Sequence, residues 1–324
     1  MDRLLAALRP DSFTLLIVAT VGLASVLPAT GVAVDWLDLA VKASVMTLFF
    51  MHGARLAREA VLQAIGHWRL QLTILAITFA LFPLLALAAS PLLERVLDPT
   101  LHFGVLFLCC LPSTVQSSIA FTSMARGNVP AAACAASASN LVGIALTPLL
   151  VGLLMSRQGE VSLGAVGSIV LLLLVPFVAG QVARPWLGAW IGRRRLLLTT
   201  VDRGAILLMI YSAFGKAVTG GVWQRISGVD LLLVVVVCAV LLALVLVLTI
   251  VAARRHGFSR ADEAAIVFCG SMKSLVTGMP MANVLFPGAQ AGLLVIPLIV
   301  FQQVQLLACA VLARRYGNTT RAQA

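Results

Sequence analysis

Charged side chains are scarce in this sequence. Only 11% of the 324 residues are Asp, Glu, Lys or Arg, whereas 61% are hydrophobic, and the mean hydropathy is +1.05. Soluble domains carry about a quarter of their residues as charges, so this composition excludes a soluble protein and indicates a polytopic membrane protein. Uncharged runs of membrane-crossing length recur along the chain, for example Leu231 to Ala253.

The sequence also lacks the motifs of metal and redox chemistry. It contains no C-x-x-C pair, no H-E-x-x-H and no G-x-S-x-G motif. All six cysteines fall inside predicted spans, where packing is the expected role: Cys109, Cys110, Cys134, Cys238, Cys269 and Cys309. The four histidines lie near span ends or in loops. We therefore expect no cofactor and no enzymatic activity.

Hydropathy predicts ten membrane-spanning helices. They cover residues 13–30, 36–53, 70–90, 102–124, 130–155, 163–183, 204–221, 230–252, 264–283 and 289–312. The fourth and ninth have the lowest hydropathy. No cleavage site is evident near the N-terminus, so the first span is expected to be an uncleaved helix.

The net charge of +11 is explained by topology. Of the 20 arginines, 17 fall at the termini or in alternate connections, and only Arg95, Arg157 and Arg225 fall on the other side. The positive-inside rule then places both termini in the cytoplasm, in agreement with an even number of spans. The charge therefore does not indicate a nucleic-acid partner. The Arg- and Ala-rich composition favours a bacterial inner membrane, with the lipid bilayer as the surrounding partner.

Two short segments suggest an internal repeat. STVQS at 113–117 and GSMKS at 270–274 are small and polar, and each ends 13 residues before a proline. They lie in spans four and nine, which are equivalent positions of two five-span halves. Because five is odd, the second half enters the membrane from the opposite side, so we expect inverted repeats at 1–160 and 161–324 within a single membrane unit.

Spans four and nine are expected to be broken helices. Pro112 should loosen the first, whereas Gly270, Gly278 and Pro280 should loosen the second. Paired interruptions of this kind indicate the binding site of a transporter, because they free backbone groups to hold ions and substrate. The alternative is that small polar residues only permit close helix packing. The candidate binding residues are Ser113, Thr114, Gln116, Ser117, Ser118, Asn140, Ser271, Lys273, Ser274, Thr277 and Gln302, and Ser137, Ser139, Gln303 and Gln305 could add ligands.

Lys273 is the least expected residue in these segments. A lysine in the middle of a bilayer costs roughly 2.5–3.5 kcal/mol on insertion scales, so it indicates a functional site. The alternative is a side chain that extends to the membrane interface. The same alternative applies to Lys42 near the outer interface, whereas Lys216 lies deep in its span and could face a substrate cavity.

The two interrupted segments carry a family resemblance. The run FLCCLPSTVQSSIAFTSMARGNVPAAACAASASNLVGIALTPLL at 107–150 and the run FCGSMKSLVTGMPMANVLF at 268–286 resemble the bile acid:sodium symporter family. They are most similar to its divergent SBF-like branch, which includes member seven of solute carrier family ten. The resemblance implies two inverted five-helix repeats, a panel and a core domain, and broken helices four and nine that cross. It also implies alternating access for a small organic anion coupled to sodium.

The resemblance assigns sodium ligands residue by residue. The polar pair after the proline of helix four corresponds to Ser117 and Ser118, and the ligand five residues before the proline of helix three corresponds to Thr78. A further polar position on helix five falls near Ala136 and Ser137. The family's shared glutamate on helix nine, however, is replaced by Phe268.

The loss of that glutamate bears on ion coupling. No carboxylate remains between Ala264 and Asn283, and Lys273 takes the place of a family asparagine. A lysine ammonium supplies the charge of a bound cation permanently, so Lys273 could be a surrogate cation that attracts an anionic substrate. Because burial favours the neutral form of an amine, Lys273 could instead be the proton-coupling group.

Two other classes of function are compatible with the sequence. A serine with a lysine base is a known nucleophilic pairing, and Ser117 or Ser118 could approach Lys273 in an intramembrane hydrolase. A membrane scaffold or regulator without transport is the other alternative. The sequence favours transport, and it identifies neither the substrate nor the oligomeric state.

Overall fold

Helices make up almost the whole of the computed structural model. It describes residues 12–55, 67–156, 163–221, 227–286 and 291–323, and no strand occurs in those ranges. Helices account for 89% of the structure, which confirms the predicted all-α class. The elements are α2 (Ser12–Val26), α3 (Val32–Arg55), α5 (Trp68–Ala76), the π-helix η1 (Ile77–Leu81), α6 (Phe82–Val96), α7 (Pro99–Cys110), α8 (Val115–Met124), α9 (Val129–Ser156), α10 (Leu163–Arg193), α11 (Arg195–Thr219), α12 (Gly228–Arg255), α13 (Arg260–Ser271), α14 (Leu275–Leu285), α15 (Ala291–Leu294) and α16 (Ile296–Gln323).

Each predicted span overlaps a helix or a consecutive set of helices. Five helical segments in the described ranges have the length and apolar character needed to cross a membrane, and a sixth forms if α7 and α8 count as one span. The helix α2 is shorter than a typical span, and α3 carries Asp35, Asp38 and Lys42. A membrane protein is therefore supported, whereas the number of ten spans stays a prediction.

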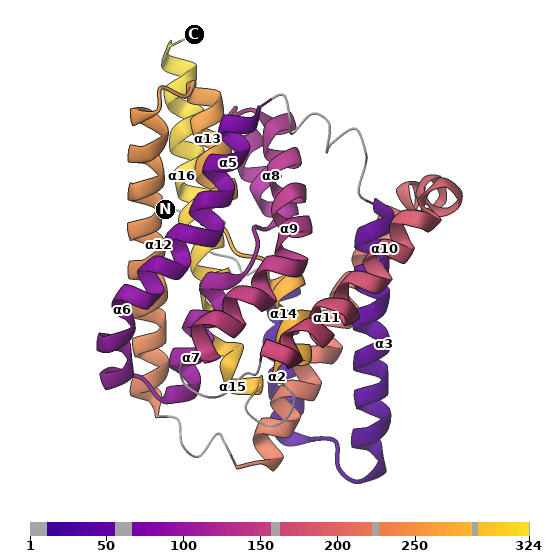
Figure 1. Ribbon diagram of the computed structural model, residues 1–324. Coiled ribbons are helices and arrows are strands. Elements are labelled where there is room, and N and C mark those ends of the chain that lie inside the picture. Colours follow the sequence, from indigo (N-terminus) through magenta and orange to yellow (C-terminus); the bar gives the residue numbers. More distant parts are fainter. Residues whose placement is uncertain (1–11, 56–66, 157–162, 222–226, 287–290, 324) are drawn as a thin grey trace.

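Four helices form a group on one side of the molecule. In Figure 1, α3 and α10 lie side by side at the right, and α11 contacts both α2 and α3. Two glycines set the close approach of α3 and α10. A Cβ atom added at Gly53 would lie 2.0 Å from the carbonyl oxygen of Phe177, and one added at Gly180 would lie 2.0 Å from that of Phe50. Only glycine therefore fits at these two crossing points.

We expect Gly53→Ala to destabilise this pair of helices by about 2 kcal/mol, because the added methyl group forces the backbones apart. The matched control is Gly22→Ala on α2, where nothing lies within 4 Å of the added Cβ. That change should be neutral or slightly stabilising, because alanine is the better helix former. Thermal unfolding of the two purified variants tests this, and equal melting temperatures would contradict the packing described here.

The remaining helices form a second group around the broken segments. The helices α5 to α9 and α12 to α16 pack around a large apolar core, which continues into α2, α3, α10 and α11. At the end where α13 begins, Glu263 is 4% exposed and accepts hydrogen bonds from Arg254, Arg260 and Tyr316. These contacts join α12, α13 and α16, so the start of α13 is held in place.

Candidate functional site

Two broken helices meet in the middle of the second group. The helix α7 ends at Cys110 and α8 begins at Val115, with an angle of 63° between them. The helix α13 ends at Ser271 and α14 begins at Leu275. Pro112 lies in the first break, as the sequence predicts. The second break lies at 272–274. The expectation for Gly270, Gly278 and Pro280 is therefore wrong, because Gly270 is inside α13 and the other two are inside α14.

The two breaks also correct the register of the proposed repeat. Thr114 is the N-cap residue of α8 and Ser274 is the N-cap residue of α14. Ser113, and not Gln116, therefore takes the position equivalent to Lys273. The match between STVQS and GSMKS pairs residues that are about one helical turn out of step.

The breaks are joined directly through the backbone. The N–H of Ser274 donates to the carbonyl oxygen of Pro112 at 2.9 Å. Hydroxyl groups of the first break reach carbonyls of the second: Ser113 to Cys269 at 2.6 Å, Ser118 to Phe268 at 3.1 Å and Thr114 to Lys273 at 2.8 Å. Backbone groups that the breaks release are thus satisfied across the crossing, as buried polar groups require.

The side chain of Lys273 lies at the centre of this arrangement. It is fully buried, and its Nζ donates to the carbonyl oxygens of Thr78 at 2.8 Å, Cys109 at 2.9 Å and Leu111 at 2.7 Å. The ring of Phe82 lies 4.1 Å from Nζ and adds a cation–π contact. The amine is therefore enclosed by three oxygens and one aromatic face.

These carbonyls are available because of local backbone geometry. Around Thr78 the helix takes the π form, so the N–H of Phe82 bonds to Ile77, and the next residue, Pro83, has no N–H. The carbonyl of Thr78 is then left without a donor from its own helix. Cys109 and Leu111 lie at the break of α7, where the N–H of Ser113 donates to the side chain of Ser139.

The number of oxygens around Nζ bears on the protonation of the amine. An ammonium group has three N–H donors, whereas a neutral amine has two and would turn its lone pair toward a carbonyl oxygen. Three acceptors within 2.9 Å therefore match a protonated Lys273. A ring of carbonyl oxygens can hold a desolvated cation, so this geometry suits the charged form of the side chain.

Gln305 fixes the backbone of the same residue. Its Oε1 accepts from the N–H of Lys273 at 2.8 Å, and its Nε2 donates to the carbonyl of Lys273 at 2.9 Å and to Gln302 at 2.7 Å. Gln305 is fully buried, and all of its hydrogen-bonding groups are used. It links Lys273 to Gln302, which borders the adjacent cavity.

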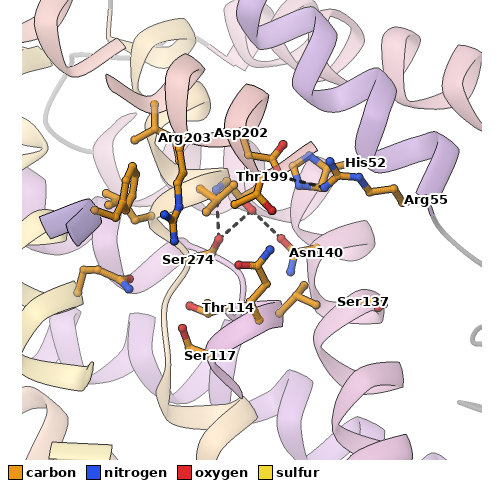
Figure 2. Close-up of a pocket in the computed structure, with 18 of the residues that line it drawn as sticks. His52, Arg55, Thr114, Ser117, Ser137, Asn140, Thr199, Asp202, Arg203 and Ser274 are labelled. Carbon is orange, nitrogen blue, oxygen red and sulfur yellow. Dashed lines mark hydrogen bonds and ion pairs between the residues drawn. The ribbon is translucent and has the colours of Figure 1, made fainter. Parts of the chain in front are cut away.

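A cavity of about 420 Å³ separates the crossing from the group of α2, α3, α10 and α11. This volume is within the range of small-molecule sites. One wall carries neutral polar side chains from α8, α9, α14 and α16. On it, Thr277 hydrogen-bonds to both Ser274 and Asn140, the two of these residues that Figure 2 labels. The other wall carries Phe49, Phe177 and Ile206 together with charged residues.

The predicted candidates divide into two sets. Those that border the cavity are Thr114, Gln116, Ser117, Asn140, Ser274, Thr277 and Gln302. Those that lie elsewhere, inside the packed crossing, are Thr78, Ser113, Ser118, Ser271 and Lys273. Ser118 is buried against α13, whereas the neighbouring Ser117 borders the cavity. The two residues of the predicted sodium site therefore face in different directions. No cluster of three metal-binding side chains occurs in the described ranges.

The other lysines lie outside the site. Lys216 pairs with Asp38 at 2.5 Å, and neither residue borders the cavity. Lys42 is exposed. The Ser–Lys pairing considered for a hydrolase is not formed, because the donors of Lys273 all face carbonyls and the hydroxyl of Ser118 is bonded to Phe268.

Sequence reasoning missed the charged wall. Arg55 pairs with Asp202 at 2.9 Å, and both border the cavity with His52 and Arg203 (Figure 2). In the sequence these arginines are already explained by the positive-inside rule. Asp202 gave the one available signal, because it is an isolated acid within a predominantly apolar helix.

Comparisons with known proteins agree with the geometry. The SBF-like CPA transporter family matches residues 11–318. An uncharacterized protein of Pseudomonas aeruginosa is 54% identical over 311 residues, which cover 95% of this chain and 93% of that protein. YfeH of Escherichia coli, whose name assigns it provisionally to the symporters, is 51% identical over 96% of this chain and 94% of its own length. The sodium/bile acid cotransporter 7 of Mus musculus is 30% identical over 96% of this chain and 93% of its own length.

Proposed function

The chain belongs to the SBF-like CPA transporter family, as its sequence motifs indicated, and on that premise we propose that it is a secondary active transporter. It moves a small organic anion across the membrane by alternating access. The observation that carries the proposal is the cavity between the two broken helices and the group of α2, α3, α10 and α11. A site bordered by interrupted helices is the arrangement that transporters use to bind substrate.

The proposed moving parts follow the packing of the helices. The helices α2, α3, α10 and α11 would form the panel, and the remaining helices with the crossing would form the core. With five spans in 1–160 and five in 161–324, the halves would be inverted repeats. A substrate bound in the cavity would contact both the panel and the core. Its binding free energy would therefore depend on how the two parts are placed relative to each other. A ligand can shift a conformational equilibrium only if it binds the two states with different affinity.

The proposed orientation places the cavity toward the cytoplasm. Arg55, Arg203 and Arg260 belong to the Arg-rich end of the molecule, and the cavity lies between that end and the crossing. By the positive-inside rule this end and both termini are cytoplasmic, in a bacterial inner membrane. The structure would then represent the inward-facing state.

Lys273 is proposed as a built-in cation. Relatives are named as sodium cotransporters, which suggests sodium as a coupling ion. In this chain, however, an ammonium already occupies a ring of three carbonyls and an aromatic face at the crossing. The protonated geometry favours a fixed charge over proton coupling. Because Lys273 does not border the cavity, its proposed part is to hold the crossing together, and the substrate would bind elsewhere.

Transport in proteoliposomes tests the proposal. Efflux and uptake of defined organic anions, namely a bile acid, an aryl sulfonate and a short carboxylate, would be measured with and without sodium and pH gradients. We expect saturable transport that continues when choline replaces sodium and that is lost in the double variant Asn140→Ala, Thr277→Val. Absence of transport for the wild-type protein with every anion would favour the regulator or scaffold alternative. A strict sodium requirement would contradict the built-in cation.

A further inference from the structure

The charged wall of the cavity contains one positive charge that is not compensated. Among the described residues that border the cavity, Arg55 and Asp202 form an ion pair and neutralise each other, whereas Arg203 has no carboxylate partner. The contact recorded for its guanidinium is with the ring of Phe13, at 5.1 Å. The described residues that border the cavity therefore carry one net positive charge.

The position of Arg203 suits a group that binds substrate. Figure 2 shows its side chain extending from α11 into the space above the crossing, on the side where Ser274 lies. It is half-buried, so its charge is screened less than that of an arginine in open water. A planar guanidinium can also donate two parallel hydrogen bonds to a carboxylate or sulfonate.

The opposite wall offers no comparable charge. Its polar groups are hydroxyls and amides, and Lys273 uses all three of its N–H donors on carbonyls. Among the described residues, an anion that enters the cavity therefore meets an uncompensated positive charge on the panel side only. One uncompensated arginine charge matches one negative charge on the substrate, because the charges of Arg55 and Asp202 already balance each other.

We propose that Arg203 is the substrate-binding residue that holds the anionic group, and that the site selects monoanions whose apolar part packs on Phe13, Phe49 and Phe177. This inference rests on the proposed transport function and adds to it. The anionic group would be held by the panel while the rest of the substrate contacts the hydroxyls and amides of the crossing, so the substrate bridges the two parts that move.

A thiol placed in the cavity measures its charge without knowledge of the substrate. Ser117→Cys introduces the thiol at a position that borders the cavity, and the six native cysteines are buried. The rates of reaction with a negatively charged sulfonatoethyl methanethiosulfonate and a positively charged trimethylammonioethyl analogue would be compared. Adding Arg203→Gln should lower the ratio of anionic to cationic rate about tenfold, because one charge near the thiol is lost. Arg95→Gln, at an exposed arginine distant from the cavity, is the control.

Transport measurements complete the test. Arg203→Gln should raise the KM for a transported monoanion at least tenfold, with a smaller change in kcat, and Arg203→Lys should recover part of the affinity. An unchanged rate ratio, or an unchanged KM in Arg203→Gln, would overturn the assignment even while transport itself persists. If the wild-type protein transports nothing but the rate ratio falls as expected, the proposed function fails and the charge assignment stands.

Discussion

Replacing Lys273 by alanine is expected to lower the free energy of unfolding by about 4 kcal/mol and to abolish transport. The substitution removes the donor of three buried carbonyls, those of Thr78, Cys109 and Leu111. A buried polar group left without a partner costs about 1–3 kcal/mol. The lost side chain also leaves a cavity at the point where the two broken helices are joined.

Thermal unfolding in nanodiscs and uptake in proteoliposomes measure these two effects. Lys42→Ala is the matched control, because Lys42 is an exposed lysine that does not border the cavity. Lys273→Met keeps most of the volume and removes only the charge and the donors, so it separates the polar effect from the cavity effect. If Lys273→Ala retains wild-type stability and transport, Lys273 has no part in the site.

An added cation should restore part of what Lys273→Ala loses. A small alkylammonium such as ethylammonium can enter the space vacated by the side chain and donate to the same carbonyls. We expect it, or sodium, to raise the melting temperature of the variant and not that of the wild-type protein, since a ligand stabilises only the form that has a free site. A rise of equal size in both proteins would contradict a cation site at the crossing.

The sequence predicted the outline of this site. Three features indicated broken helices at a functional crossing: Pro112, the low hydropathy of spans four and nine, and the isolated Lys273. The structure contains helix breaks at both places. These features are local, because a proline or a run of small residues weakens the helix in which it lies, although Pro280 shows that it does not always break it. The family resemblance depended on the sequences of the same two segments, and the comparisons with known proteins confirmed it.

The direction of the side chains could not be predicted from the sequence. Lys273 bonds to Thr78, which is 195 residues away, and the carbonyl is free only because a π-helix precedes Pro83. Likewise, hydropathy cannot distinguish Ser118, whose hydroxyl serves a backbone carbonyl, from Ser117, which borders the cavity. The sequence did not indicate a binding role for Arg203, because the positive-inside rule already explains an arginine at this position.

Replacing Gln305 by leucine should have the next largest effect, a loss of about 3 kcal/mol in the free energy of unfolding. The leucine fills a similar volume but leaves the buried N–H of Lys273 without a partner, and it removes the half-buried bond to the side-chain oxygen of Gln302. The carbonyl of Lys273 keeps the hydroxyl of Thr114. Chemical denaturation is the measurement. Gln303→Leu, which removes one half-buried bond to Thr14, should cost less than about 1 kcal/mol.

A double-mutant cycle then tests whether Gln305 acts through Lys273. If the amide holds the backbone of Lys273 so that Nζ reaches its three carbonyls, the double variant Lys273→Met, Gln305→Leu should cost less than the two single variants together, by at least about 1 kcal/mol. Strict additivity would mean that the two residues stabilise the crossing independently. Gln305 also bonds to Gln302, which borders the cavity. A coupling energy between Lys273 and Gln305 would therefore connect the built-in cation, through Gln302, to the wall that contacts the substrate.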